Sequence, residues 1–364
     1  MRVLMISHSD SPWAPHYSRF LMGRGDTVLL VSFSPDRIPG VDMEFVGVEP
    51  FDSTKNKHLF LTRVPRIRKI IRRFDPDVVF GPYLISDGLT AVLSSNRPTV
   101  VSARGGDVLP NPGSSRWGQR MRERVVRFVG GRADFVHAVS GNLERALLRL
   151  GVPKSKIARF PVGINVDCFH PDADMPRSTA TRLICVRKHE LVYDIPAIIE
   201  ALALLKRSGR QFHCTFLGGG SLLEANRRHA ADAGLDGFAT FTGHRPHEEL
   251  APALRQADIY ISSSLSDGTS SSLLEGMASC LFPVVTRIEA NEPWISDGRT
   301  GLMFERGRAD QLAVCLKRAM DDAPLRAAAV LENRRLVEQE GNMIRNMERL
   351  AELFERVIAQ RCSS

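Results

Sequence analysis

Residues 258–285 read DIYISSSLSDGTSSSLLEGMASCLFPVV. The apolar run Ile259–Ile261 predicts a strand, the polar run after it predicts a loop, and an amphipathic segment from Ser271 or Ser272 predicts a helix. A second apolar run, Phe282–Val285, predicts a second strand. These elements form one βαβ unit, and its polar loop lies at the carboxyl edge of the sheet, where ligands bind in open α/β folds.

The start of this predicted helix is suited to an anion. Ser270, Ser271 and Ser272 can cap it, and the N–H groups of its first turn then point into the loop. Such helix ends attract phosphates. Asp267 and Glu275 place two carboxylates beside it. A structural interpretation stays open, in which Glu275 complements the helix dipole and Asp267 forms a turn.

Length and composition favour a two-domain protein. The chain has 364 residues, 43% of them apolar, which is enough for two α/β domains with separate cores. We find no run that could span a bilayer and no signal peptide, since Val3–Ile6 meets polar residues at once, and we expect a cytoplasmic protein. The six cysteines show no pairing or metal-ligand spacing, which predicts reduced thiols and no metal site.

Charge is unevenly distributed along the chain. Residues 1–160 hold 25 Lys and Arg against 14 Asp and Glu, whereas the remainder holds 24 against 27. Two stretches supply most of the excess, RVPRIRKIIRR at 63–73 and RWGQRMRERVVR at 116–127. Each mixes cations and apolar residues at helical spacing. Each can lie on an anionic membrane or be an ordinary surface helix packed on the sheet. A basic nucleic-acid-binding protein is a different class, but no reader motif or aromatic stacking partner is evident.

Other predicted strands also end in loops with polar or glycine residues. In the N-terminal half, the candidate loop residues are His8, Ser9, Trp13 and His16 after strand 2–6, Tyr83 after strand 77–80, and Arg104 and Asp107 after strand 99–102. In the C-terminal half, they are Arg187 and Lys188 at the end of strand 182–187, Gly218 and Gly219 after strand 212–217, and His244 and Arg245 after strand 238–242.

The spacing of Asp267 and Glu275 resembles the acid-x7-acid signature of retaining GT-B glycosyltransferases, and SDGTSSSLLEGM is similar to the family 4 form. The resemblance covers nearly the whole chain. It implies an α/β protein with two doubly wound Rossmann-like domains facing across a cleft, 1–171 on the acceptor side and 172–341 binding nucleotide sugar. Segment 157–171 is similar to the family's linker. A C-terminal helix, 342–364, is expected to pack back on the first domain.

The resemblance implies a reaction and a donor site. A hexosyl group would move, with retained anomeric configuration, from a UDP-, GDP- or ADP-linked sugar, without a metal or other cofactor. Asp267 would contact the sugar, Glu275 the ribose, and the amides between them the diphosphate. The family usually has Glu at the position of Asp267 and Lys at the position of Val192, so the lysine contact is either absent or supplied by Lys188. The donor set is Arg187, Lys188, Gly218, Gly219, His244, Arg245, Asp267, Gly268, Ser270, Ser271, Ser272, Leu273, Leu274 and Glu275.

The acceptor side departs from the family at Arg104 and in the loop after strand 2–6, which has no glycine before Gly23 where the family's loop is usually glycine-rich. When the family's His-Gly-x-Asp pattern is aligned on Gly105 and Asp107, Arg104 occupies the position of the histidine. Arginine cannot act as a base, because it does not deprotonate, but it can bind a phosphate or a carboxylate. The expected acceptor-side residues are His8, Ser9, Trp13, His16, Tyr83 and Arg104, and the expected catalytic residues are Asp267, Arg187, Asp107 and His8.

The basic N-terminal half favours a lipid-linked, glycolipid or polysaccharide acceptor and a protein peripheral on the inner face of the membrane. A soluble small-molecule acceptor is the alternative, and no nucleic-acid partner is expected.

Overall fold

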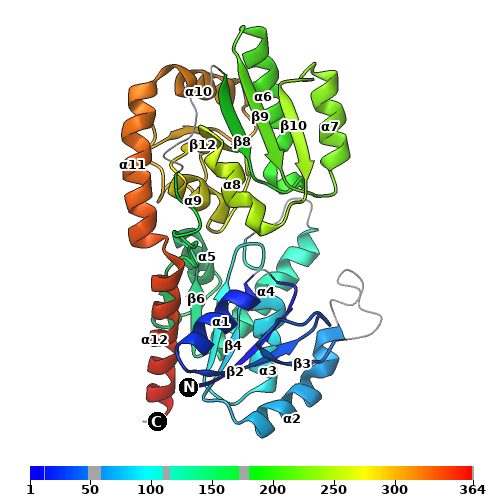
Figure 1. Ribbon diagram of the computed structural model, residues 1–364. Helices are drawn as coiled ribbons and strands as arrows, with labels where there is room; N and C mark the ends of the chain where they lie inside the picture. Colours follow the sequence, from blue (N-terminus) through cyan, green and yellow to red (C-terminus); the bar gives the residue numbers. More distant parts are fainter. Residues whose placement is uncertain (12, 48–58, 110–114, 172–179, 363–364) are drawn as a thin grey trace. The chain divides into compact units, whose positions relative to one another are not determined.

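The computed structural model describes residues 1–11, 13–47, 59–109, 115–171 and 180–362. They form two compact units: an N-terminal unit, Met1–Pro161 with Ile344–Ser364, and a C-terminal unit, Val162–Met343 (Figure 1). The predicted boundary after residue 171 lies beyond the division at Pro161. Residues 172–179, which follow this predicted boundary, lie outside the described residues.

Within the described residues, the N-terminal unit contains a seven-stranded parallel sheet of order β3-β2-β1-β4-β5-β6-β7. Its central strands are continuous buried apolar runs, as expected of a sheet covered on both faces. The strand order reverses between β1 and β4, which makes their carboxyl ends the switch point where ligands bind. The strands are β1 (Arg2–Ser7), β2 (Thr27–Ser32), β3 (Asp42–Phe45), β4 (Val78–Gly81), β5 (Thr99–Ala103), β6 (Phe135–Ala138) and β7 (Ile157–Arg159).

The helices of the N-terminal unit are α1 (Ala14–Gly23), η1 (Leu59–Arg63), α2 (Val64–Phe74), the π-helical turn η2 (Leu84–Gly88), α3 (Leu89–Ser94), α4 (Arg116–Arg132), α5 (Gly141–Arg149), η3 (Lys154–Lys156) and α12 (Met343–Cys362). Helix α12, red in Figure 1, belongs to this unit although it ends the chain. Its Phe354 ring lies 5.2 Å from that of Phe80, and Glu355 accepts a hydrogen bond from Arg24 (2.7 Å).

The described C-terminal unit contains a six-stranded parallel sheet of order β10-β9-β8-β11-β12-β13. Here the order reverses between β8 and β11, so the loops after these two strands share a switch point. The strands are β8 (Thr181–Cys185), β9 (Phe212–Leu217), β10 (Ala239–Gly243), β11 (Ile259–Ser262), β12 (Phe282–Thr286) and β13 (Leu302–Phe304).

The helices of the C-terminal unit are η4 (Leu191–Tyr193), α6 (Ile195–Arg207), α7 (Leu223–Asp232), η5 (His247–Glu249), α8 (Leu250–Arg255), α9 (Ser271–Ala278), α10 (Ala309–Asp321) and α11 (Ala323–Glu340). The order β11, α9, β12 confirms the βαβ unit predicted from residues 258–285, and the α/β class of the whole chain is confirmed with it.

One sequence-based expectation needs correction. Segment 157–171 was expected to be linker, but Ile157–Arg159 forms β7 and pairs with β6. The helical tail from residue 309 is interrupted at Asp322 and at Gly341. The Asp322 side chain accepts a hydrogen bond from the Leu325 N–H (3.0 Å) and caps α11, with proline in the first turn of that helix.

Candidate active site

One guanidinium group connects the two loops at the switch point of the C-terminal sheet. Arg187 follows β8, and its Nε donates to Ser262 Oγ at the end of β11 (3.2 Å). Its Nη2 donates to Asp267 Oδ2 (2.7 Å) and to the Ser270 hydroxyl. The guanidinium also lies over the Tyr193 ring, 5.2 Å from its centre. Arg187 and Asp267, both among the expected catalytic residues, thus form an ion pair.

Arg187 remains charged although it is largely buried. Its side chain is 10% exposed and that of Asp267 is 19% exposed. Burial alone would lower the pKa of Arg187, but Tyr260 and Asp267 raise this pKa above its ordinary value. The other oxygen of Asp267 accepts the Gly268 N–H (2.8 Å), which fixes the carboxylate in the loop. The site thus holds a permanent cation in a partly dry environment.

Helix α9 begins beside this cation. Ser270 Oγ accepts the N–H of Leu273 (3.2 Å), and Ser270 O accepts that of Leu274 (3.2 Å). The amides of Ser271 and Ser272 precede them in the first turn, where a helix offers no internal acceptor. The side chains of Leu273 and Leu274 are buried in the core, so these two leucines support the site without lining it. An anion at this end would meet amides and the positive end of the helix dipole.

Glu275 is a buried carboxyl group one turn into α9. The residue is 6% exposed. Burial raises the pKa of Glu275 to about 7, although the charge of Arg187 acts to lower it. Burial of an ionised carboxyl group is costly. Hydroxyl groups of a ligand would offset this cost by donating hydrogen bonds to it.

Glycines hold the neighbouring loops against this site. A Cβ atom on Gly218 would lie 2.1 Å from the Arg187 carbonyl oxygen, and one on Gly219 would lie 3.2 Å from Cβ of His244. The Gly219 carbonyl oxygen accepts the His189 N–H (2.9 Å). Gly218 and Gly219 therefore give close contact between the loops after β8, β9 and β10.

The other predicted donor-side cations lie further out. Lys188 is exposed beside Arg187, and the loop after β10 exposes His244 and Arg245, the latter 3.6 Å from Glu249. At the position of the family lysine, Val192 contributes its carbonyl oxygen to the Leu265 N–H (2.8 Å). The cation nearest Asp267 is therefore Arg187.

The loop after β1 is attached to the end of β2. His8 Nδ1 lies 3.2 Å from Ser34 Oγ. Ser9 is buried, and its N–H donates to Ser32 Oγ (3.0 Å). Burial lowers the pKa of His8, with Asp10 acting in the opposite direction, so the imidazole is neutral at physiological pH. His8 is thus placed at the N-terminal switch point in the protonation state of a base.

Arg104 is held between two aromatic side chains. Its Cζ lies 4.3 Å from the centre of the Trp13 ring, and its Nη1 donates to Tyr17 Oη (2.7 Å). The His16 ring lies 6.3 Å from that of Trp13, and Tyr83 is partly exposed where η2 begins. Three of the predicted acceptor-side residues, Trp13, His16 and Arg104, thus lie in one cluster.

Asp107 fixes the backbone of the loop that carries Arg104. It is fully buried, and its carboxyl oxygens accept the N–H groups of Arg104 (3.0 Å), Gly105 (2.7 Å) and Leu84 (3.1 Å). Burial raises the pKa of Asp107, although these hydrogen bonds act to lower it. Because all its contacts are with the backbone, the geometry favours a role in orienting the loop over one in proton transfer.

Sequence reasoning missed several residues that hold the site together. Ser262, Tyr193 and Tyr260 surround Arg187, and Tyr17 holds Arg104. A short polar side chain at the end of β11 and an aromatic one near the family's lysine position were the available signals. Neither signal predicts a contact with Arg187, which lies 75 positions from Ser262 and 6 positions from Tyr193 in the chain.

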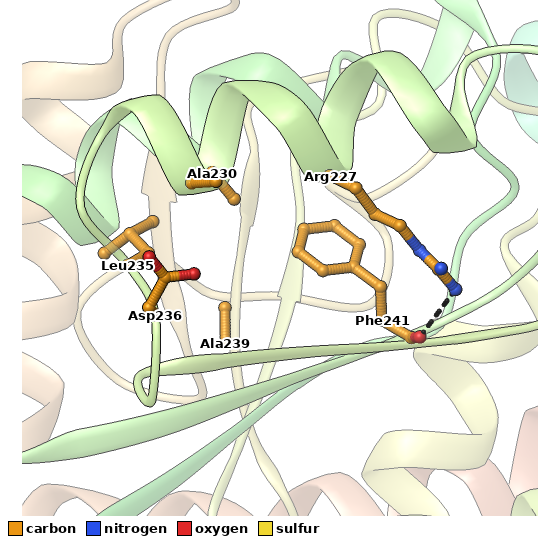
Figure 2. A pocket seen from close by; sticks show the side chains of 7 residues that line it. Arg227, Ala230, Leu235, Asp236, Ala239 and Phe241 are labelled. Atoms are coloured by element: carbon orange, nitrogen blue, oxygen red, sulfur yellow. Dashed lines mark hydrogen bonds between the residues drawn. The ribbon is translucent and has the colours of Figure 1, made fainter.

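A cavity of about 270 Å³ elsewhere in the C-terminal unit is a different feature (Figure 2). It lies under α7 near the start of β10, and Arg227 Nη2 donates to Phe241 O (3.0 Å) beside it. Its lining is Arg227, Ala230, Ala231, Leu235, Asp236, Ala239 and Phe241. None of these belongs to the predicted donor set.

Neither a metal-ligand cluster nor a membrane-spanning helix is present in the part of the chain that the structure describes. There, no group of three or more His, Cys, Asp or Glu side chains could hold a metal ion. No helix among the same residues is long and apolar enough to cross a bilayer.

Known proteins match this chain in sequence and in fold. Two family models match it: glycosyl transferases group 1 over residues 175–335 and glycosyltransferase family 4 over residues 16–168. The Anabaena protein HepE, solved in complex with UDP-glucose, superposes with a TM-score of 0.80 at 14% identity, covering 98% of this chain and 100% of that one. The fold is therefore GT-B.

Curated relatives agree with the family models. The amylovoran biosynthesis glycosyltransferase AmsK of Erwinia amylovora is 29% identical over 59% of this chain and 54% of its own length. A GDP-mannose-dependent alpha-(1-6)-phosphatidylinositol monomannoside mannosyltransferase of Mycolicibacterium smegmatis is 26% identical over 57% of this chain and 58% of its own length. The matched stretches span little more than half of these relatives.

The two parallel α/β sheets and the matches together define a two-domain α/β protein with a GT-B architecture. The chain belongs to glycosyltransferase family 4.

Proposed function

We propose that this chain transfers a hexosyl group from a nucleotide-diphosphate sugar, with retention of configuration, to a hydroxyl group of a lipid-linked or glycan acceptor. The observation that carries the proposal is Arg187, fixed between Asp267 and Ser270 at the start of α9. Family membership and the HepE complex with UDP-glucose support a nucleotide-sugar donor. The candidate donors are UDP-, GDP- and ADP-linked hexoses.

The diphosphate would bind at the start of α9. Its negative charge would face the guanidinium of Arg187 and the amides of Ser271 and Ser272. As the glycosidic bond breaks, further charge develops on the departing phosphate, and a fixed cation in a partly dry site stabilises it without reorganisation. Arg187 would then contribute more to the transition state than to donor binding.

The two carboxyl groups would bind the neutral parts of the donor. A ribose diol would donate hydrogen bonds to the buried Glu275 carboxylate. Asp267 would accept a sugar hydroxyl on the side of the loop. Because Asp267 already pairs with Arg187, it would also orient the cation toward the diphosphate.

The N-terminal unit would bind the acceptor. Arg104, supported by Trp13 and Tyr17, presents a cation where the family has a histidine, which favours an acceptor with a phosphate or carboxylate near its reacting hydroxyl. A lipid-linked acceptor carries such a phosphate. The relatives support a lipid-linked or glycan acceptor, since one is named for a phosphatidylinositol mannoside acceptor and another for polysaccharide biosynthesis.

Hydrolysis of the donor in the absence of acceptor tests the donor half of the proposal. A panel of UDP-, GDP- and ADP-linked hexoses should include at least one that the wild-type chain hydrolyses slowly, and Arg187→Ala should abolish that reaction. Hydrolysis of none of them, or equal hydrolysis by Arg187→Ala, would contradict the proposal.

A further inference from the structure

The two basic helices of the N-terminal unit present different faces to solvent. In α2, the apolar side chains Ile67, Ile70 and Ile71 are buried in the core, so its outer face is polar. In α4, the apolar side chains Trp117, Met121 and Phe128 are exposed by 72%, 39% and 42%. We call these three residues the α4 stripe. The apolar residues of α4 are thus divided between the core and the surface.

The α4 stripe lies on one side of a fixed helix. Its members are four and seven residues apart, which at 3.6 residues per turn places them in one narrow row. The opposite side, with Val126, Val129 and Gly130, is buried. A Cβ atom on Gly130 would lie 2.5 Å from a Val152 methyl group, so the helix packs tightly on the protein. The stripe is therefore presented by a preformed helix.

Cations surround the α4 stripe. Helix α4 contains six arginines and one glutamate. Arg116, Arg120 and Arg124, which we call the α4 cations, are exposed and make no ion pair among the described residues. Arg132 lies over the Phe128 ring, 5.6 Å from its centre. Aromatic and thioether side chains among exposed arginines are typical of helices that lie in the interface of an anionic bilayer.

We propose that the exposed face of α4, the α4 stripe with the α4 cations, binds the surface of an anionic phospholipid bilayer. The apolar side chains would enter the headgroup layer, and the guanidinium groups would contact lipid phosphates. Because this face is positively charged, an anionic bilayer fits it better than an apolar protein surface does. Helix α2, whose isoleucines are buried, would add only long-range attraction.

The position of α4 connects this surface to the proposed acceptor site. Arg122 Nη1 donates to Leu109 O (3.2 Å), two residues after Asp107, so α4 is attached to the loop that carries Arg104. A lipid-linked acceptor would then reach Arg104 from the bilayer to which α4 is bound. This part of the inference rests on the proposed function, whereas binding of α4 to lipid does not.

Vesicle co-sedimentation of the full chain tests the proposal. Wild type should bind vesicles of phosphatidylcholine mixed with phosphatidylglycerol, weakly bind those of phosphatidylcholine alone, and dissociate as salt screens charges beyond about 8 Å. Neutralising the α4 cations together (Arg116→Gln, Arg120→Gln, Arg124→Gln) should weaken partitioning roughly a hundredfold, at about fivefold for each cation. The matched control removes the same charge from α2 (Arg66→Gln, Lys69→Gln, Arg72→Gln) and should weaken partitioning clearly less than the α4 variant does.

A second pair of variants tests the apolar part. Trp117→Ser with Phe128→Ser should lower partitioning at least tenfold. Val314→Ser with Leu331→Ser, at two comparably exposed positions of the C-terminal unit, should not change it. In wild type, tryptophan emission should shift to the blue on anionic vesicles, and Trp117→Phe should remove that shift.

Three outcomes would overturn the inference: no binding to anionic vesicles, equal losses for the α4 and α2 triple variants, or an α4 stripe variant that changes the oligomeric state instead of lipid binding. Stabilisation by nucleoside diphosphate, measured on the same proteins, reports separately on the proposed function. Lack of lipid binding by α4 would therefore not contradict the proposed function, and lack of stabilisation by nucleoside diphosphate would not contradict lipid binding.

Discussion

Replacing Glu275 by Gln is expected to stabilise the free protein and, at the same time, to weaken nucleotide binding. In the free protein, burial raises the pKa of Glu275 from 4.5 to about 7. Each pKa unit corresponds to about 1.4 kcal/mol, so the ionised group costs the folded chain about 3 kcal/mol above neutral pH. Gln has nearly the same shape without the charge, and it avoids most of this cost.

The pH dependence of this effect has a definite sign. Because the folded pKa lies above the unfolded one, the folded chain binds more protons than the unfolded chain between about pH 4.5 and pH 7. Wild-type stability therefore falls as the pH rises through this window. The gain of Glu275→Gln over wild type should be complete above pH 7 and should disappear below pH 4.5.

Urea unfolding across this pH range measures the gain, and titration with nucleoside diphosphate measures binding. Loss of a charge-assisted hydrogen bond to the ribose should cost about 1.5–3 kcal/mol, or roughly 10- to 100-fold in Kd. Glu352→Gln, at an exposed position of α12, is the matched control and should change stability by less than about 0.5 kcal/mol. A Glu275→Gln protein with unchanged stability above pH 7 and unchanged nucleotide affinity would refute this account of the site.

Three further predictions concern the cations and a glycine. Arg187→Ala should lower kcat for donor hydrolysis roughly 100- to 1000-fold and nucleotide affinity much less; equal losses would assign it to ground-state binding. Arg104→Gln should raise the acceptor KM roughly 10- to 100-fold and leave donor hydrolysis unchanged, and a loss of hydrolysis would place Arg104 at the donor instead. Gly218→Ala should destabilise the chain by about 1–3 kcal/mol, because its Cβ would lie 2.1 Å from the Arg187 carbonyl oxygen. Gly131→Ala, with no atom within 4 Å of the new methyl group, is its control, and equal effects on urea unfolding would contradict the packing argument.

The sequence predicts the fold well where periodicity and burial agree. The βαβ unit was placed to within a residue or two, because a four-residue apolar run and a serine-capped helix leave few alternatives. The short strand β7 was missed because its three residues, Ile-Ala-Arg, have no clear alternation and depend on pairing with β6. Such an edge strand is specified by tertiary contact and not by local pattern.

The candidate site was predictable as a set of loops, but not as a set of contacts. Parallel strands bring their carboxyl ends to one edge, so Arg187 and Asp267 could be expected near each other. Their ion pair, the role of Ser262 and the burial of Glu275 depend on side-chain geometry that one sequence does not specify. The same holds for α4, where a sequence pattern shared with α2 leads to an exposed apolar stripe in one helix and a buried one in the other.

The most direct test of the central claim, that the start of α9 beside Arg187 binds a nucleoside diphosphate, is thermal stabilisation by UDP, GDP and ADP. At about 100 times its Kd, a bound nucleotide should add about 2.7 kcal/mol to the stability of the folded chain. We expect at least one of the three to stabilise the wild type, Arg187→Ala and Glu275→Gln to reduce that stabilisation, and Arg104→Gln to preserve it. Stabilisation by none of them, or full stabilisation of Arg187→Ala and Glu275→Gln, would contradict the claim.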